Sequence, residues 1–420
     1  MDSTRLDALK TTFTSRIPYC SGTCHVPVEY LTLFYSHGED ESASRVNLSN
    51  ATAVQLESLS RACQPATFGL NNENRLDETY RKAGKLDLGN FSTPFDPTHA
   101  GIVDHICNEL LVGDQKLELE LYKLNVYEKD GFFKRHQDTP RSERMFGSLV
   151  VIFPTGYEGG ELIFRHDGDE FVVEFTDAFK QASQPSVGYV AFFGDIEHEV
   201  APVRSGYRVT LTYNLYFGSP GTDQSVPRAL PNISPQEKPF ETSLVELINC
   251  PDVLPQGGYL GFGLQYQYPV TPKQKLSTLK PFLKGSDAVL ASVCNRLSLS
   301  WDIKVLYVAA KQWSTTKQYV LIGNIPDYKH MLEDDDIIET LEKGGGVEVN
   351  IVGSSTAPVA RSRWDSGPPP TDLLAIRNMN GTTKITTRYV AYGNEPQISH
   401  MYGHLCLVVR LDSAANREKF

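Results

Sequence analysis

The chain has 420 residues, which is too long for one ordinary domain and makes two domains the natural expectation. Hydrophobic residues make up 40% of it and charged residues 22%, as is typical of a globular protein. The formal net charge of −11 disfavours non-specific nucleic-acid binding, which usually needs a basic face. No window approaches the roughly 20 apolar residues that a membrane-spanning helix requires. We therefore expect neither nucleic acid nor membrane as a partner.

The amino-terminal segment and the cysteines indicate the compartment. Residues 1–10 include acidic side chains and lack the apolar core of a signal peptide. The seven cysteines are odd in number and scattered, and without a secretion signal they are interpreted as reduced thiols. We expect a cytoplasmic or nuclear protein. Nothing in the sequence indicates its oligomeric state.

Residues 1–115 are predicted to form a region of mixed but largely helical structure that packs on a following barrel. One helix is expected over 51–63. Another is expected to begin at Asp96-Pro97, a capping residue followed by a proline in the first turn, and to end at Gly113.

Residues 116–217 change in character to short strand patterns separated by turns. The segment 116–127 alternates between apolar and polar residues, with a phase slip near Leu121-Tyr122 that indicates a bulge. The run 148–153 is continuously apolar, which favours a strand buried on both sides. Further strands are expected at 161–164, 171–175, 189–193 and 207–217. Many short strands at this spacing predict a sandwich or a jelly roll. Together with the helices expected before and after them, they make α+β the expected fold class.

The rest of the chain is predicted to be a proline-rich linker followed by a second domain. Residues 218–240 contain five prolines and are interpreted as an extended linker. Residues 241–420 have mixed helix and strand patterns, and the sequence does not indicate their role. Short stretches near 391–395 and 403–409 faintly repeat the patterns at 193–197 and 206–211, so a degenerate second barrel is one expectation.

The residues most informative about chemistry are His136, Asp138 and His198. Side chains alternate along an extended chain, so His136 and Asp138 point the same way and can reach one ion. His198 directly follows a buried strand pattern, where a histidine can face the mouth of a barrel. Two imidazoles and one carboxylate hold a non-haem Fe(II) on one face and leave the other positions open. Taken alone, each motif also fits an ordinary surface loop, and only their combination favours a metal site.

Arg208 provides an independent indication. From Tyr207 to Phe217 the residues alternate strictly, so Arg208 and Thr210 share a face with the next threonine. A buried arginine is costly unless it meets an anion, and a guanidinium beside a hydroxyl suits the distal carboxylate of 2-oxoglutarate. The alternative is that this face is exposed to solvent at a sheet edge.

Three segments, two of which contain the residues named above, match the motifs of a known family in the same order along the chain. The run 127–138, with Tyr127, a glycine four residues later and the His-x-Asp pair, resembles the start of the catalytic domain of prolyl 4-hydroxylases. The segment 158–162 resembles their Gly-Gly-Glu-Thr turn, with Leu162 in place of threonine, and 194–208 resembles their distal-histidine segment. Residues 136–150 also resemble a group of fungal proteins that carry this domain. The chain is thus identified as similar to Fe(II)/2-oxoglutarate-dependent oxygenases with a double-stranded β-helix.

The resemblance implies a site and a reaction. His136, Asp138 and His198 would bind Fe(II), Arg208 would bind the C5 carboxylate of 2-oxoglutarate, and Tyr127 would hydrogen-bond the same group. O2 would be the second co-substrate, with ascorbate in a supporting role and succinate and CO2 as products. Halogenating relatives replace the carboxylate ligand, so Asp138 favours hydroxylation of a C–H bond. A proline in a protein and a small secondary metabolite are alternative substrates, and a vestigial barrel used as an interaction module is the alternative outside enzymes.

Overall fold

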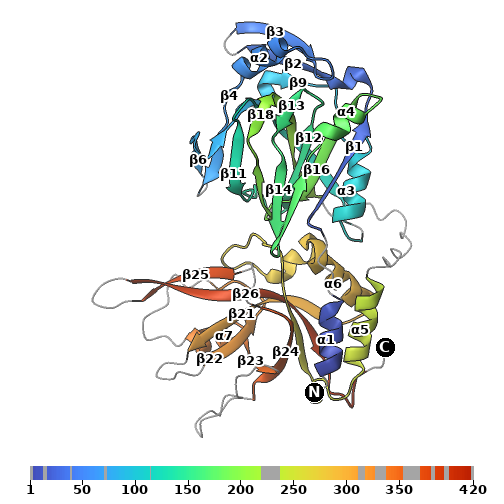
Figure 1. Ribbon diagram of the computed structural model, residues 1–420. Coiled ribbons are helices and arrows are strands. Elements are labelled where there is room, and N and C mark those ends of the chain that lie inside the picture. The colour runs from blue at the N-terminus through green and yellow to red at the C-terminus, as the bar shows by residue number, and fades with distance from the viewer. Residues whose placement is uncertain are drawn as a thin grey trace. The chain divides into compact units, whose positions relative to one another are not determined.

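The computed structural model describes residues 3–12, 17–37, 40–70, 73–113, 115–218, 237–310, 317–326, 337–352, 369–379, 384–391 and 397–417. The chain divides into two compact units, one of residues 17–224 and one of residues 1–16 with 225–420. The predicted linker over 218–240 lies for the most part outside the described residues, and the helix α5 (Lys238–Ile248) begins inside its last part. Each unit has its own sheets (Figure 1).

The unit of residues 17–224 contains two large antiparallel sheets. The seven-stranded sheet has the order β1-β16-β12-β19-β10-β8-β4, and the five-stranded sheet has the order β15-β14-β17-β11-β7. The strands of the first are β1 (Tyr19–His25), β4 (Gln64–Pro65), β8 (Gly84–Asp87), β10 (Leu117–Tyr127), β12 (Met145–Ile152), β16 (Ser186–Phe193) and β19 (Arg208–Phe217). Those of the second are β7 (Arg81–Lys82), β11 (Phe132–His136), β14 (Leu162–His166), β15 (Asp169–Val173) and β17 (Glu197–Val200).

The chain passes repeatedly from one sheet to the other between β10 and β19, which is the connectivity of a jelly roll. β19 lies in the interior of the larger sheet between β12 and β10, so the alternative of an exposed edge for Arg208 is wrong. The phase slip expected near Leu121 is confirmed as a register shift between Leu121 and Lys123. β13 (Tyr157–Gly159) and β18 (Val203–Gly206) form a separate two-stranded sheet. In the chain, β13 directly precedes β14 and β18 directly precedes β19.

The expectation of a largely helical region over 1–115 is wrong. Only α1 (Ser3–Thr11), α2 (Ala53–Ala62) and α3 (Ile102–Leu110) are α-helices among its described residues. Strands alternate with them: besides those already given, these are β2 (Thr32–His37), β3 (Asp40–Asn47), β5 (Phe68–Leu70), β6 (Glu73–Arg75) and β9 (Phe91–Ser92). β1 even forms the edge of the large sheet beside β16. Short two- or three-residue strands carry too little alternation to be recognised as a pattern.

The two helices expected in this region do form. α2 begins after Thr52, whose side chain and that of Gln55 make a capping box. α3 begins at Ile102, later than expected, because Asp96 caps a preceding turn through the N–H of Thr98 instead. Its buried stripe of Ile102, Ile106 and Leu110 packs toward β1 and β16.

The unit that contains the carboxyl-terminal region is built on one mixed sheet. Its described strands have the order β20-β24-β23-β22-β21-β26-β25, and β20 also pairs with β26, which closes six of them into a ring. They are β20 (Gly258–Gly263), β21 (Trp301–Ala310), β22 (Lys317–Ile322), β23 (Val347–Val352), β24 (Thr371–Arg377), β25 (Lys384–Ala391) and β26 (Gln397–Leu411). β24 is parallel to both neighbours, unlike any strand of the first unit's two large sheets. The described strands therefore do not form a second copy of the jelly roll.

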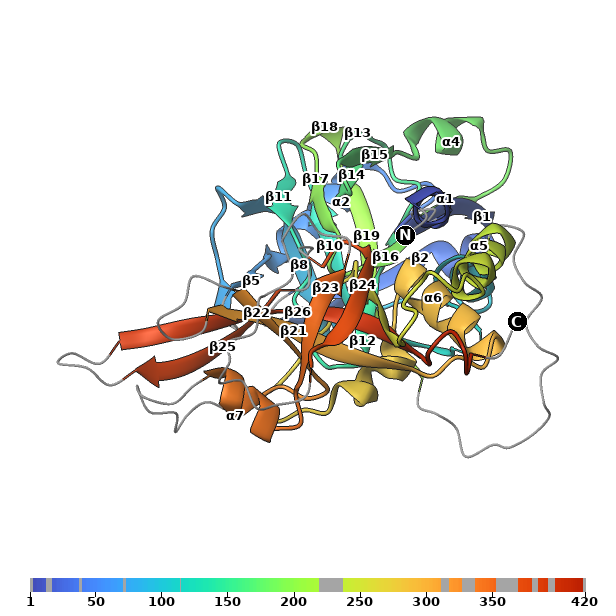
Figure 2. The ribbon, with the colours of Figure 1, turned by 90° about the horizontal axis from the view of Figure 1, so that it is seen from below.

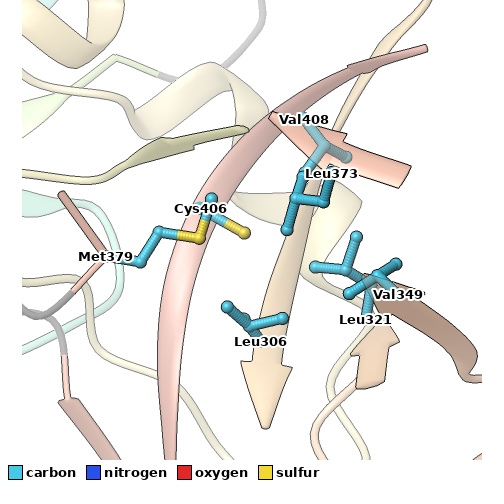
Figure 3. Packing of buried hydrophobic residues seen from close by; sticks show 7 residues of the cluster. All are labelled: Leu306, Leu321, Val349, Leu373, Met379, Cys406 and Val408. Carbon is cyan, nitrogen blue, oxygen red and sulfur yellow. The ribbon is translucent and has the colours of Figure 1, made fainter. Parts of the chain in front are cut away.

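Apolar side chains from neighbouring strands of this sheet, and one from the segment that follows β24, pack against one another, as Figure 3 shows. The cluster consists of Leu306, Leu321, Val349, Leu373, Met379, Cys406 and Val408. The helices of this unit are α1, α5, α6 (Gly285–Arg296) and α7 (Ile337–Lys343). α1 contacts α5, so the first residues of the chain belong to this unit (Figures 1 and 2). The seven cysteines are free thiols, and no described helix is long and apolar enough to cross a membrane.

Candidate active site

Strand pairing in the smaller sheet brings the two histidines together. β11 and β17 are antiparallel neighbours, and His136 lies directly opposite His198 in their register. Their ring centroids are 4.2 Å apart. Asp138 follows the end of β11 by two residues, and its backbone N–H donates to the carbonyl of Gly194 at 2.8 Å. One potential ligand atom from each of the three residues lies within 4.8 Å of the other two, so the structure brings the predicted triad together.

The hydrogen bonds of these side chains leave their ligand atoms free. Nδ1 of His136 lies 2.7 Å from the carbonyl oxygen of Lys134, and Nδ1 of His198 lies 2.8 Å from that of Ile196. A carbonyl only accepts, so each Nδ1 carries the proton and each Nε2 presents a lone pair. The Ser148 hydroxyl donates to Oδ2 of Asp138 at 2.6 Å, while Oδ1 lies 3.9 Å from Nε2 of His198. Such outer partners hold metal ligands in orientation. The donor set therefore fits Fe(II).

The charge states of the triad suit a divalent cation. Burial, together with the nearby His198, lowers the pKa of His136 to about 3. Burial alone would raise the pKa of Asp138, but the two histidines and the Ser148 hydroxyl outweigh it and hold that pKa below its usual value. At neutral pH His136 is neutral and Asp138 is a carboxylate. Metal binding requires both of these forms.

Aromatic side chains fix the positions of the imidazoles. Phe133 stacks on His136 with the ring centroids 3.5 Å apart. The centroid of Phe192 lies 4.5 Å from that of His198, and Phe164 packs on the same imidazole at 6.1 Å. These rings exclude water from one side of the triad, which strengthens electrostatic interactions there.

Arg208 projects into the same cavity from the larger sheet. The cavity has a volume of about 1010 Å³, and the triad, Arg208, Thr210 and Tyr127 all contribute to its wall. Arg208 is only 3% exposed and Thr210 only 1%. Arg208 lies opposite Tyr127 in the pairing of β10 with β19, and its guanidinium carbon is 5.6 Å from the centre of the Tyr127 ring. The alternation predicted for this strand is thus confirmed, since Arg208 and Thr210 both face inward.

The surroundings of Arg208 leave it in need of an anion. Its guanidinium donates a hydrogen bond to the Tyr157 hydroxyl, a neutral group. No carboxylate in the described part of the chain forms an ion pair with it. Gly160, at φ +69°, makes room for it, because a Cβ there would lie 2.7 Å from Cδ of Arg208. A buried cation without a counter-charge is costly, which fits a site for a ligand carboxylate.

Some residues of this cavity were not predicted from the sequence. Ser148 is a polar residue within an apolar run, and that contrast was a usable signal. Tyr157 and Gly160 lie in the turn that resembles the family motif, but their contact with Arg208 depends on the fold. Arg81 and Lys123 also line the cavity, and no pattern in the sequence indicated Arg81.

Comparison with known proteins gives one family and several solved structures. Residues 122–216 match the model of the 2OG-Fe(II) oxygenase superfamily. A Pseudomonas putida prolyl-4-hydroxylase is 18% identical, over 50% of this chain and 98% of that one, with a TM-score of 0.29. A Trichoplax adhaerens prolyl hydroxylase, solved in complex with a peptide fragment of a hypoxia inducible factor oxygen degradation domain, is 14% identical over 51% and 88%, with a TM-score of 0.27. A Burkholderia pseudomallei oxidoreductase of the 2OG-Fe(II) oxygenase family is 16% identical over 39% and 78%, with a TM-score of 0.25. No curated protein matches the chain.

Proposed function

Since residues 122–216 match the model of the 2OG-Fe(II) oxygenase superfamily, we propose that the protein is an Fe(II)- and 2-oxoglutarate-dependent dioxygenase. It hydroxylates a C–H bond of a substrate and converts 2-oxoglutarate and O2 to succinate and CO2. Fe(II), when bound, supplies the centre at which 2-oxoglutarate and O2 react. Ascorbate is proposed only as a supporting reductant, and the cytoplasm or nucleus as the compartment.

One observation carries this proposal: the triad with oriented ligand atoms and the buried Arg208 share one cavity. His136, Asp138 and His198 hold the metal through two Nε2 atoms and one carboxylate oxygen. Arg208 binds the C5 carboxylate of 2-oxoglutarate through a fork of charge-assisted hydrogen bonds. Thr210 and Tyr127 provide hydroxyl groups beside that carboxylate. The aromatic wall around the triad keeps bulk water from one side of the reacting centre.

The sequence motifs also bear on the substrate. The prolyl 4-hydroxylase motifs favour a proline in a protein, and a small secondary metabolite is the alternative. An interaction module that has lost its chemistry is disfavoured, because a vestigial site has no need for two correctly protonated histidines, an ionised Asp138 and a buried arginine. These features are costly to maintain in a cavity without a ligand.

Succinate formation tests the proposal. The full chain with Fe(II), 2-oxoglutarate and O2 should form succinate slowly even without the second substrate, and omission of any one component should stop it. His198→Ala should reduce succinate formation to background, because one metal ligand is lost. Lys129→Met changes an exposed charge away from the cavity and should behave like the unaltered protein. Equal succinate formation by the unaltered protein and His198→Ala would contradict the proposal.

A further inference from the structure

Besides Arg208, the cavity wall contains two cations, Arg81 and Lys123, that the proposed chemistry does not use. Arg81 lies on β7, in the smaller sheet, and Lys123 lies on β10, in the larger one. Both line the cavity that holds the triad. The guanidinium carbon of Arg81 lies 4.4 Å from the centre of the Phe133 ring, and that ring stacks on His136. Arg81 is therefore separated from a candidate metal ligand by a single aromatic ring.

Arg81 is buried among neutral partners. It is 4% exposed, and it donates to the carbonyl of Thr67 and to Oδ1 of Asn125, both at 2.8 Å. Asn125 in turn donates to the hydroxyl of Thr212 at 3.0 Å, which fixes the amide that orients the guanidinium. The Nε of Arg81 is buried and has no hydrogen-bond partner. No described carboxylate pairs with this arginine, so its charge is uncompensated.

Lys123 is the second cation of this part of the cavity wall. It lies opposite Thr212 in the register of β10 with β19, and its ammonium is 4.4 Å from the centre of the Tyr122 ring. Within the described residues it has neither an ion pair nor a side-chain hydrogen bond. Burial, and then the charge of Arg81, lower the pKa of Lys123 to about 7, although the carboxylate of Asp138 acts in the opposite direction. Two cations that repel each other inside one cavity are a common arrangement for binding an anion.

If the proposed function holds, 2-oxoglutarate does not occupy Arg81 or Lys123. One carboxylate of 2-oxoglutarate is assigned to the metal and the other to Arg208. We propose that Arg81 and Lys123 form an anion-binding subsite that holds a carboxylate or phosphate group of the substrate to be oxidised. Arg81 offers the unpaired Nε together with its Nη atoms, which suits a planar or tetrahedral oxyanion.

The wall beside the subsite indicates the rest of the substrate. The ring of Tyr80 lies 4.5 Å from that of Phe68 and 6.0 Å from that of Phe133, measured between centroids. All three rings line the cavity near Arg81. A substrate with an anionic group on an apolar or planar body would contact both features. The side chain of a target proline is uncharged, so a protein substrate would have to supply the anion from another residue near that proline.

Binding of matched probes tests the subsite without catalysis. The full chain, loaded with Zn(II) and saturated with 2-oxoglutarate, is titrated into 4-fluorobenzoate, 4-fluorophenyl phosphate and the neutral 4-fluorobenzamide, and binding is followed by fluorine NMR. At least one anionic probe should bind about tenfold or more tightly than the amide. The carboxylate and phosphate arms show which oxyanion the subsite prefers. Equal binding of all three probes would overturn the inference.

Variants locate the binding within the cavity. Arg81→Met and Lys123→Met should each weaken the preferred anion about tenfold, and Arg81→Lys should recover part of the loss because it keeps the charge but not the fork. Lys129→Met, which removes an exposed cation outside the cavity, should leave probe binding unchanged. If Arg81→Met fails to fold, Lys123→Met decides the same point. Unchanged probe binding in both Arg81→Met and Lys123→Met would contradict the subsite.

The same titration without metal and 2-oxoglutarate separates the two proposals. Anion binding that depends on Arg81 in the metal-free protein would support the subsite even if no succinate were formed. Succinate formation by a protein that does not distinguish acid from amide would uphold the dioxygenase and refute the subsite.

Discussion

Single hydrogen bonds determine what the residues of the cavity can do. The carbonyls of Lys134 and Ile196 each lie two residues before a histidine and fix its tautomer, so the local backbone of each strand presets the metal ligand. The hydroxyl of Ser148, on the facing sheet, donates to Asp138 and fixes the orientation of its carboxylate. The triad could be predicted from the sequence because its residue types and spacing are distinctive. These supporting contacts could not, because they depend on strand register and on carbonyl groups that every residue has.

Arg208→Ala should separate co-substrate binding from metal binding. The triad is untouched, so Fe(II) affinity should stay nearly constant. Loss of charge-assisted hydrogen bonds, at roughly 1.5–3 kcal/mol each, should weaken 2-oxoglutarate binding at least tenfold. Arg208→Lys should restore part of the affinity. Calorimetric titration of 2-oxoglutarate under argon measures this, and unchanged affinity in Arg208→Ala would assign the anchor to another residue.

Lys123 should make stability depend on pH in a defined direction. The unfolded chain binds a proton at Lys123 up to a pKa near 10.5, while the folded chain binds it only below about 7. Between these values the unfolded state binds more protons, so this residue makes stability fall as pH falls from 10.5 to 7. Lys123→Met should therefore stabilise the metal-free protein most near pH 7, with a gain that disappears toward pH 10.5. Denaturant unfolding across this range measures it, and a pH-independent gain equal to that of Lys129→Met would refute it.

At the scale of elements, the register of β11 with β17 and of β10 with β19 positions the site. The first pairing sets His136 opposite His198, and the second sets Tyr127 opposite Arg208. Long alternating or continuously apolar strands, such as β10, β12, β16 and β19, were predictable because their patterns extend over many residues. The short strand β7, which carries Arg81, was not, because two residues contain no period.

The turn between β13 and β14 should control the position of Arg208. Gly160→Ala places a Cβ 2.7 Å from Cδ of Arg208 and requires φ +69°, so it should displace the guanidinium and weaken 2-oxoglutarate binding severalfold. Gly156→Ala in the same segment meets no atom within 4 Å at its Cβ and serves as the matched control. The two variants are compared in the same calorimetric titration. Equal affinities would show that the turn does not position Arg208.

At the scale of the whole molecule, the chain is two compact units with different sheets. The candidate site lies entirely within the unit of residues 17–224, whereas the first sixteen residues join the carboxyl-terminal unit through α1 and α5. The packing of the amino-terminal segment in the carboxyl-terminal unit could not be predicted, because the sequence of a nine-residue helix does not indicate its packing partner. The existence of two units could be predicted from length and from the prolines between them.

Limited proteolysis should cut the chain first between the two units. The proline-rich composition predicts the first cut between 218 and 240, where Arg228 offers a site for trypsin. The amino-terminal fragment, which still carries residues 1–16, should then retain 2-oxoglutarate binding in the presence of metal, because every residue of the cavity lies within it. Mass spectrometry identifies the first cut. Initial cleavage within 116–217 would show that the unit boundary is misplaced.

The central claim is that His136, Asp138 and His198 hold Fe(II) in the cavity that binds 2-oxoglutarate. Anaerobic titration of 2-oxoglutarate into the Fe(II)-loaded protein, followed by visible absorption, tests it most directly, because a metal-to-ligand charge-transfer band arises only when both share one centre. The unaltered protein should show a saturable band, and His136→Ala, Asp138→Ala and His198→Ala should each lose it. A band that persists in all three variants, or its absence from an unaltered protein that binds both Fe(II) and 2-oxoglutarate, would contradict the account.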